Sequence, residues 1–205
     1  DGDADRVIIL DELGNEIDGD QLIALIAKNL QSENKIQGNT VVSTVMSNLG
    51  LLRYLKDLGL NLFRTHVGDR YVSEIMKEKG FNFGGEKSGH IIMTDYSSTG
   101  DGLLAALYFL SILKDSGKTT SQLLNVFKPT PQKLLNLNFE SKDDPLDNPE
   151  FNKTIYELRK KISDSGEILV RKSGTEPVIR IMIQHNDTKI FEEILEEINY
   201  MTSKL

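Results

Sequence analysis

The sequence of 205 residues contains no cysteine and no tryptophan. Without cysteine the chain has no disulfides, no thiolate metal ligands and no cysteine nucleophile. No apolar run is long enough to span a bilayer, and no signal peptide opens the chain. We therefore expect a cytoplasmic protein that does not interact with membranes.

Positive charge is in the minority, with 24 Lys and Arg against 31 Asp and Glu, for a net charge of −7. Runs of Lys and Arg are absent as well, which argues against a nucleic-acid partner or an anionic membrane surface. A local pocket for a small anion remains compatible with this balance. The length suits one large or two modest domains.

Strand and helix patterns alternate along the first two thirds of the chain. Apolar and β-branched runs predict strands at residues 7–10, 40–45, 60–65, 81–83 and 91–93. Helical spacing and capping residues predict helices at residues 20–30, 48–58, 69–79 and 101–114. This order is typical of an α/β layer domain with a largely parallel sheet.

A proline cluster at residues 128–131 marks a predicted domain boundary, because two nearly adjacent prolines oppose a helix. Beyond it we expect a strand at 133–139, a helix at 152–162, strands at 167–172 and 178–184, and a helix from Thr188. That βαββα order indicates a small α+β domain with a mixed or antiparallel sheet.

The chain opens on the acidic run DGDADR, residues 1–6. The carboxylates of Asp1, Asp3 and Asp5 can converge on one hard cation, and Arg6 suits a metal that also holds a phosphate. Two alternatives stay open. An EF-hand calcium loop would need glycine where Arg6 stands, and an acidic surface turn would bind nothing.

A glycine-rich segment, GGEKSGH, covers residues 84–90. Its glycines let the backbone approach a ligand, while Glu86, Ser88 and His90 offer an acceptor, a hydroxyl and an imidazole suited to sugar hydroxyls. His90 could also transfer a proton near neutral pH. A plain hairpin turn would have a similar composition.

A third polar segment, RKSGTEP, covers residues 171–177. Its cations, hydroxyls and glycine, with Arg180 in the following strand, form a plausible phosphate cradle. Arg180 should share a strand face with Val178 and Met182. The alternative is a hairpin turn with solvated charges, and the spacing does not match a P-loop.

Two further aspartates stand at predicted helix starts, Asp69 and Asp101. Capping is the commoner role for an aspartate in such a place. His66 is more simply explained as a structural loop residue.

In this order the three segments resemble the motifs of the α-D-phosphohexomutase superfamily. VMSNLG (45–50), VGDRYV (67–72) and TGDG (99–102) are similar to its bacterial branch that acts on glucosamine phosphates. The resemblance implies a four-domain enzyme in which each domain contributes one loop to a central cleft. Residues 1–15 would be the tail of the second domain, 16–128 the third, mixed α/β layer domain, and 129–205 the small α+β fourth domain.

The resemblance also implies roles for the residues of the three motifs. Asp1, Asp3 and Asp5 would hold Mg²⁺, with Arg6 nearby. Glu86, Ser88 and His90 would recognise the sugar, and His90 would transfer protons with Asp69 and Arg70 in support. The phosphate that is not transferred would be held by Arg171, Ser173, Gly174, Thr175 and Arg180.

The activity implied is the interconversion of glucosamine 6-phosphate and glucosamine 1-phosphate through a phosphoserine and a bisphosphate, for cell-wall precursors. No serine here matches the phosphoserine context, and the chain starts without methionine. We therefore expect an inactive C-terminal piece whose partner is the N-terminal half of the enzyme; a homodimer is compatible with the resemblance. The alternatives are a phosphomannomutase or phosphoglucomutase, and a non-catalytic module that binds a divalent ion or a sugar phosphate.

Overall fold

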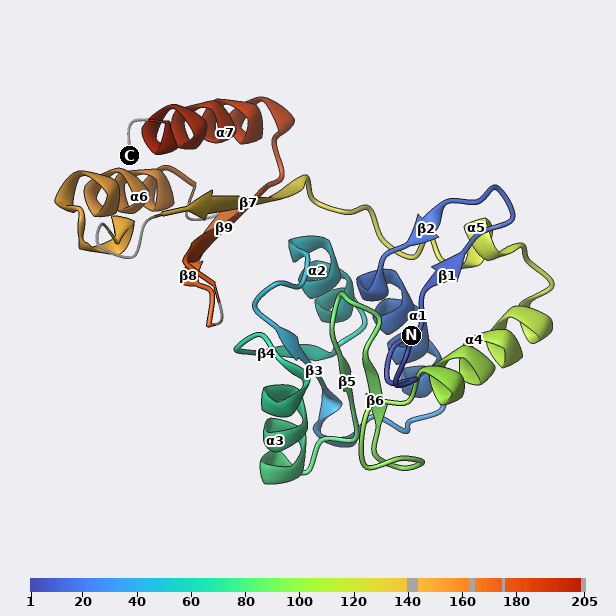
Figure 1. The fold of residues 1–205 in the computed structure, drawn as a ribbon. Helices are drawn as coiled ribbons and strands as arrows, with labels where there is room; N and C mark the ends of the chain where they lie inside the picture. The colour runs from blue at the N-terminus through green and yellow to red at the C-terminus, as the bar shows by residue number, and fades with distance from the viewer. Residues whose placement is uncertain (140–143, 163–164, 175, 204–205) are drawn as a thin grey trace. The chain divides into compact units, whose positions relative to one another are not determined.

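The computed structural model describes residues 1–205 except 140–143, 163–164, 175 and 204–205. The chain divides into two compact units, Asp1–Pro129 and Thr130–Leu205 (Figure 1). Each unit has its own apolar core, and each is described by itself below.

The first unit is built on a sheet of the order β4-β3-β5-β6. Its strands are β3 (Thr40–Thr44), β4 (Asn61–Thr65), β5 (Phe83–Gly85) and β6 (Ile91–Met93). β3 runs parallel to both β4 and β5, while β5 and β6 form an antiparallel hairpin. The expectation of a largely parallel sheet is therefore confirmed.

Helices cover both faces of this sheet (Figure 1). They are α1 (Gly19–Ser32), α2 (Leu49–Asp57), α3 (Asp69–Lys79), α4 (Gly102–Ser116) and the single-turn α5 (Thr120–Leu123), with a 3₁₀ turn η1 (Gln37–Asn39) before β3. The larger core joins α1, α2 and α4 to one sheet face, and a smaller cluster packs α3 against the other. Burial on both faces explains why the strands read as continuous apolar runs rather than alternating ones.

Capping residues mark the first and last turns of these helices near the positions that the sequence predicted. Asp18, Asn48 and Asp101 each accept a hydrogen bond from a backbone N–H in the first turn of α1, α2 and α4. α3 ends at Gly80, whose positive φ of 70° is the left-handed conformation that glycine adopts most readily. α5 was not predicted, because a single turn is too short to show helical periodicity.

The N-terminal segment contributes a small hairpin of β1 (Ile9–Leu10) and β2 (Glu16–Ile17). The predicted strand at 7–10 is shorter in the structure, because Val7 pairs through its backbone with Gly89 instead.

The second unit holds an antiparallel sheet of the order β7-β9-β8 among its described residues. The elements are β7 (Gln132–Asn138), a 3₁₀ turn η2 (Pro145–Asp147), α6 (Pro149–Ile162), β8 (Gly166–Lys172), β9 (Val178–His185) and α7 (Thr188–Thr202). Both helices pack on one face, against Ile179, Ile181 and Ile183 of β9. The predicted βαββα order is confirmed.

None of the helices in the described part of the chain is both long enough and apolar enough to cross a membrane.

The glycine-rich segment differs from its prediction, because Gly84 and Gly85 lie in β5 rather than in a loop. Gly84 pairs with Val42 of β3. A methyl group on Gly84 would lie 2.6 Å from the Val42 carbonyl oxygen and 2.8 Å from the Met76 sulfur. Glycine is thus what allows β5 to lie this close to β3.

We expect Gly84→Ala to destabilise the protein by about 1–3 kcal/mol, because the strands must separate to admit the methyl group. Urea unfolding followed by circular dichroism measures the change. Gly2→Ala is the matched control, since a methyl group there meets no described atom within 4 Å. An unchanged midpoint for Gly84→Ala would show that β3 and β5 are not so closely packed.

Candidate functional site

The acidic loop forms a tight turn that gathers its carboxylates. One oxygen each from Asp1, Asp3 and Asp5 lies within 4.8 Å of the others. The turn depends on Ala4, whose φ is 62°. The Nε of Arg6 lies 2.7 Å from Asp1 Oδ2 and 3.4 Å from Asp5 Oδ1.

These three carboxylates fit a hard divalent cation. All the ligand atoms are oxygen, which is what Mg²⁺ and Ca²⁺ prefer. Asp5 Oδ1 is buried and has no hydrogen-bond partner among the described residues. Arg6 Nε, at 3.4 Å, offsets part of the cost of burying this oxygen, and a bound cation would offset more.

Main-chain contacts hold the acidic loop beside the glycine-rich loop. The Val7 N–H donates to the Gly89 carbonyl at 3.2 Å, and Arg6 forms an isolated antiparallel bridge with His90. Gly89 has a φ of 88°, and a side chain there would clash with the Val7 carbonyl. The glycine is therefore needed for the two loops to meet.

The glycine-rich loop itself is a turn between β5 and β6. The Glu86 N–H donates to the His90 carbonyl at 2.8 Å, and Glu86 Oε1 accepts from the Gly68 N–H at 3.0 Å. Ser88 is exposed at the tip. His90, by contrast, is only 4% exposed, with the Gly100 backbone against its ring.

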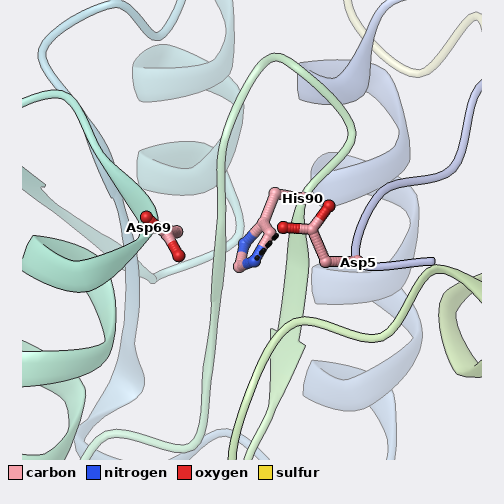
Figure 2. Close-up of side chains that lie close together, drawn as sticks. All are labelled: Asp5, Asp69 and His90. Carbon is pink, nitrogen blue, oxygen red and sulfur yellow. Dashed lines mark ion pairs between the residues drawn. The ribbon is translucent and has the colours of Figure 1, made fainter. Parts of the chain in front are cut away.

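The imidazole of His90 lies between two carboxylates, those of Asp5 and Asp69 (Figure 2). His90 Nε2 is 3.6 Å from Asp5 Oδ2. Asp69 is the first residue of α3, and the cap position is Gly68, with no side-chain cap hydrogen bond among the described residues. The capping explanation for Asp69 was therefore wrong.

Arg70, the other α3 residue in the predicted set, lies on the surface. Its Nε is 2.7 Å from Glu74 Oε1, one helical turn further along α3. The contact found for its guanidinium is thus within α3 and not with His90.

The N-terminus of α1 contacts the glycine-rich loop. Lys87 forms an ion pair with Asp18, and the Gly19 N–H donates to the Lys87 carbonyl at 3.1 Å. The sequence analysis gave Asp18, Asp20 and Lys87 no role in a functional site. The charge pairing of Asp18 with Lys87 across 69 positions has no local sequence signal.

Asp20, in the first turn of α1, is fully buried. Its Oδ2 accepts from the Asn48 N–H at 2.8 Å, which ties α1 to the start of α2. Its Oδ1 has no hydrogen-bond partner within the described chain. Burial, and then the charge of Asp18, raise the pKa of Asp20 to about 7.

The third predicted segment connects β8 and β9 in the second unit. Arg171 lies directly opposite Arg180 in this strand pair. Directly opposite residues share a face, and this face is the one turned away from Ile179 and Ile181 of the core. Two guanidinium groups at paired positions on one face can both donate to a single bound anion.

The turn itself is closed by the Ser173 N–H, which donates to the Val178 carbonyl at 2.8 Å. That N–H is therefore already used and does not contribute to an anion nest. Gly174 is exposed, and Thr175 lies outside the described residues. Glu176 lies 3.6 Å from the Arg180 guanidinium.

Comparison with known families and proteins identifies both units. Residues 18–130 match the family model "Phosphoglucomutase/phosphomannomutase, alpha/beta/alpha domain III", and residues 134–200 match the C-terminal domain of the same family. The chain belongs to the phosphoglucomutase/phosphomannomutase family. The resemblance to the phosphohexomutases is thus confirmed.

Among curated relatives, the phosphoglucosamine mutase of Paracoccus denitrificans is 50% identical over 198 residues, which cover 97% of this chain and 44% of the relative. The phosphoglucosamine mutase of Phenylobacterium zucineum is 51% identical over the same shares. The chain therefore spans less than half the length of the curated relatives it matches.

Solved structures share the fold at low identity. A phosphoglucomutase/phosphomannomutase family protein from Burkholderia thailandensis aligns with a TM-score of 0.77 and 24% identity, covering 97% of this chain and 44% of that one. N-acetylphosphoglucosamine mutase of Aspergillus fumigatus, in complex with GlcNAc-6P and magnesium, aligns with a TM-score of 0.75 and 19% identity, covering 96% and 50%.

The raised pKa of Asp20 predicts a specific dependence of stability on pH. Asp20 in the unfolded chain ionises near pH 3.8, whereas in the folded protein it keeps its proton up to about pH 7. The folded state therefore binds more protons in this window, and the contribution of Asp20 to stability falls as pH rises through it, by an amount on the order of 4 kcal/mol.

Asp20→Asn keeps an oxygen for the Asn48 N–H but carries no ionisable group. We expect the variant to gain stability over the wild type progressively between pH 4 and pH 7, with a constant difference above. Urea unfolding across this range gives the two profiles. Parallel profiles would contradict the raised pKa.

Proposed function

We propose that this chain is the C-terminal part of a phosphoglucosamine mutase, a cytoplasmic enzyme that interconverts glucosamine 6-phosphate and glucosamine 1-phosphate. The observation that carries the proposal is the junction of the acidic loop with the glycine-rich loop, around His90. About 50% identity to phosphoglucosamine mutases over 97% of the chain supports the substrate class. The product would feed amino-sugar precursors of the cell wall.

In this proposal Asp1, Asp3 and Asp5 hold Mg²⁺. The magnesium complex of the Aspergillus fumigatus mutase supports that choice of ion. The bound ion would supply positive charge that offsets the negative charge of a phosphoryl group. Arg6, paired with Asp1, would add a guanidinium on the same side of the loop.

The glycine-rich loop would recognise the sugar. Ser88 is exposed at its tip and can donate to or accept from a hydroxyl, and Glu86 can accept. His90 would transfer the proton of the reacting hydroxyl, because its ring lies beside the metal loop. Asp69 and Arg70 would support it, Asp69 as a carboxylate facing the imidazole (Figure 2).

The β8–β9 turn would hold the phosphate that is not transferred. Arg171 and Arg180 lie opposite one another, and two guanidinium groups can form charge-assisted hydrogen bonds to a dianionic phosphate. Ser173, Gly174 and Thr175 would complete the loop around it. The GlcNAc-6P complex of the Aspergillus fumigatus mutase supports a sugar phosphate as the ligand.

The reaction would need a phosphoserine that donates its phosphoryl group to the sugar phosphate and takes the other one back from the bisphosphate. The curated relatives extend well beyond the matched region, and we place the phosphoserine in the N-terminal half that they include. The 205-residue chain alone should then show no turnover. A homodimer of the complete enzyme is part of the same proposal.

Kinetics of the complete enzyme test this function. We expect kcat/KM for glucosamine 6-phosphate to exceed that for mannose 6-phosphate and glucose 6-phosphate by at least about tenfold, because a site that hydrogen-bonds a substrate amino group rejects analogues that lack it. A preference for either neutral sugar would instead indicate a phosphomannomutase or phosphoglucomutase. Turnover by the 205-residue chain alone would refute the assignment of the missing phosphoserine.

We expect Arg171→Ala to weaken binding of glucosamine 6-phosphate by about 10- to 100-fold, the loss typical of a charge-assisted hydrogen bond. Calorimetry on the 205-residue chain provides the measurement. Lys172→Ala is the matched control: it removes the same charge one position along β8, where the ammonium pairs with Asp144 at 2.6 Å. Equal losses in both variants would point to net charge and not to a phosphate site.

A further inference from the structure

Asp5, Asp69 and His90 form a group of metal-ligand type distinct from the three aspartates of the acidic loop. One ligand atom from each lies within 4.8 Å of the other two. The residues come from three separate segments: the acidic loop, the start of α3 and the end of the glycine-rich loop just before β6 (Figure 2). Only Asp5 is shared with the acidic loop.

His90 provides an independent sign of a ligand. Its side chain is almost fully buried, and its Nδ1 has no hydrogen-bond partner among the described residues. Its Nε2 faces Asp5 Oδ2 at 3.6 Å, which is too long for a hydrogen bond. A bound ion in contact with one of the ring nitrogens would offset part of the cost of burying an imidazole that forms no hydrogen bond among the described residues.

The spacing suits an ion in that position. Nitrogen and oxygen ligands lie about 2.0–2.2 Å from a zinc ion, so neighbouring ligand atoms are about 3–3.5 Å apart. The separation of His90 from Asp5 is close to this value. Asp69 is exposed at the helix start, and its side chain can rotate to close the remaining distance.

The ligand set also selects the kind of ion. An imidazole with two carboxylates is typical of Zn²⁺ and other first-row transition ions, whereas Mg²⁺ prefers oxygen ligands alone. We propose that Asp5, Asp69 and His90 form a second cation site, selective for a first-row transition ion of the Zn²⁺ class, next to the all-carboxylate acidic loop.

Sharing Asp5 couples this site to the acidic loop. One carboxylate serves both sites and two divalent ions repel one another, so each ion weakens binding of the other. A transition ion would also occupy an imidazole nitrogen of His90. An ion in this site would therefore weaken Mg²⁺ binding and, in the complete enzyme, inhibit the reaction. Binding of the ion itself does not depend on the proposed activity.

Calorimetric titration of the 205-residue chain with Zn²⁺, and visible absorption on titration with Co²⁺, test the site. We expect His90→Gln and Asp69→Asn each to weaken Zn²⁺ binding by at least about tenfold and to alter the Co²⁺ spectrum. Asp69 is exposed, so Asp69→Asn remains informative if the buried His90→Gln fails to fold.

Asp3→Asn is the matched control, because Asp3 belongs to the acidic loop alone. We expect it to weaken Mg²⁺ binding while leaving Zn²⁺ affinity within about threefold, and we expect Mg²⁺ affinity to be unchanged in Asp69→Asn. The proposal would be overturned if Zn²⁺ affinity followed Asp3 and not Asp69, or if neither His90→Gln nor Asp69→Asn changed it.

Discussion

A short stretch of backbone pairing, between residues 6–7 and 89–90, underlies the candidate site of the first unit. Arg6 bridges His90, and Val7 donates to Gly89. This contact brings the acidic loop and the glycine-rich loop together, although more than eighty residues separate them in the sequence. It requires glycine at position 89, because the main chain there has a positive φ and abuts a carbonyl.

Asp5 is common to two groups of candidate metal ligands. It belongs to the three carboxylates that suit a hard cation, and its other neighbours are an imidazole and the carboxylate of Asp69. The three carboxylates of the acidic loop suit a hard ion such as Mg²⁺, whereas the group that contains the His90 nitrogen suits a transition ion. In our proposals the same carboxylate links the Mg²⁺ site to the competing site for a transition ion.

The anion site that we propose for the second unit depends on strand register. Pairing of β8 with β9 sets Arg171 opposite Arg180 on the sheet face opposite to the one that packs against the helices. Two guanidinium groups at paired positions can both donate to one anion. The register is strongly specified, because a slip by one residue would turn Ile179 and Ile181 out of the core.

Local patterns predicted most of the fold, since helix caps and apolar spacing depend only on nearby residues. α3 begins and ends at its predicted residues, because Gly80 provides the left-handed stop. Where prediction failed, contacts from distant residues decided: β5 extends through Gly84 because glycine fits against Val42 of β3, and Val7 pairs with Gly89 instead of extending β1.

The sequence by itself determined the residue types of the three polar segments, and with them the kinds of ligand each can bind. Only the tertiary structure decided which of these residues meet. Asp69 faces His90 instead of capping α3, and burial beside Asp18 raises the pKa of Asp20. The reason is physical: ion binding and proton affinity depend on distances and desolvation between groups that folding brings together from distant parts of the chain.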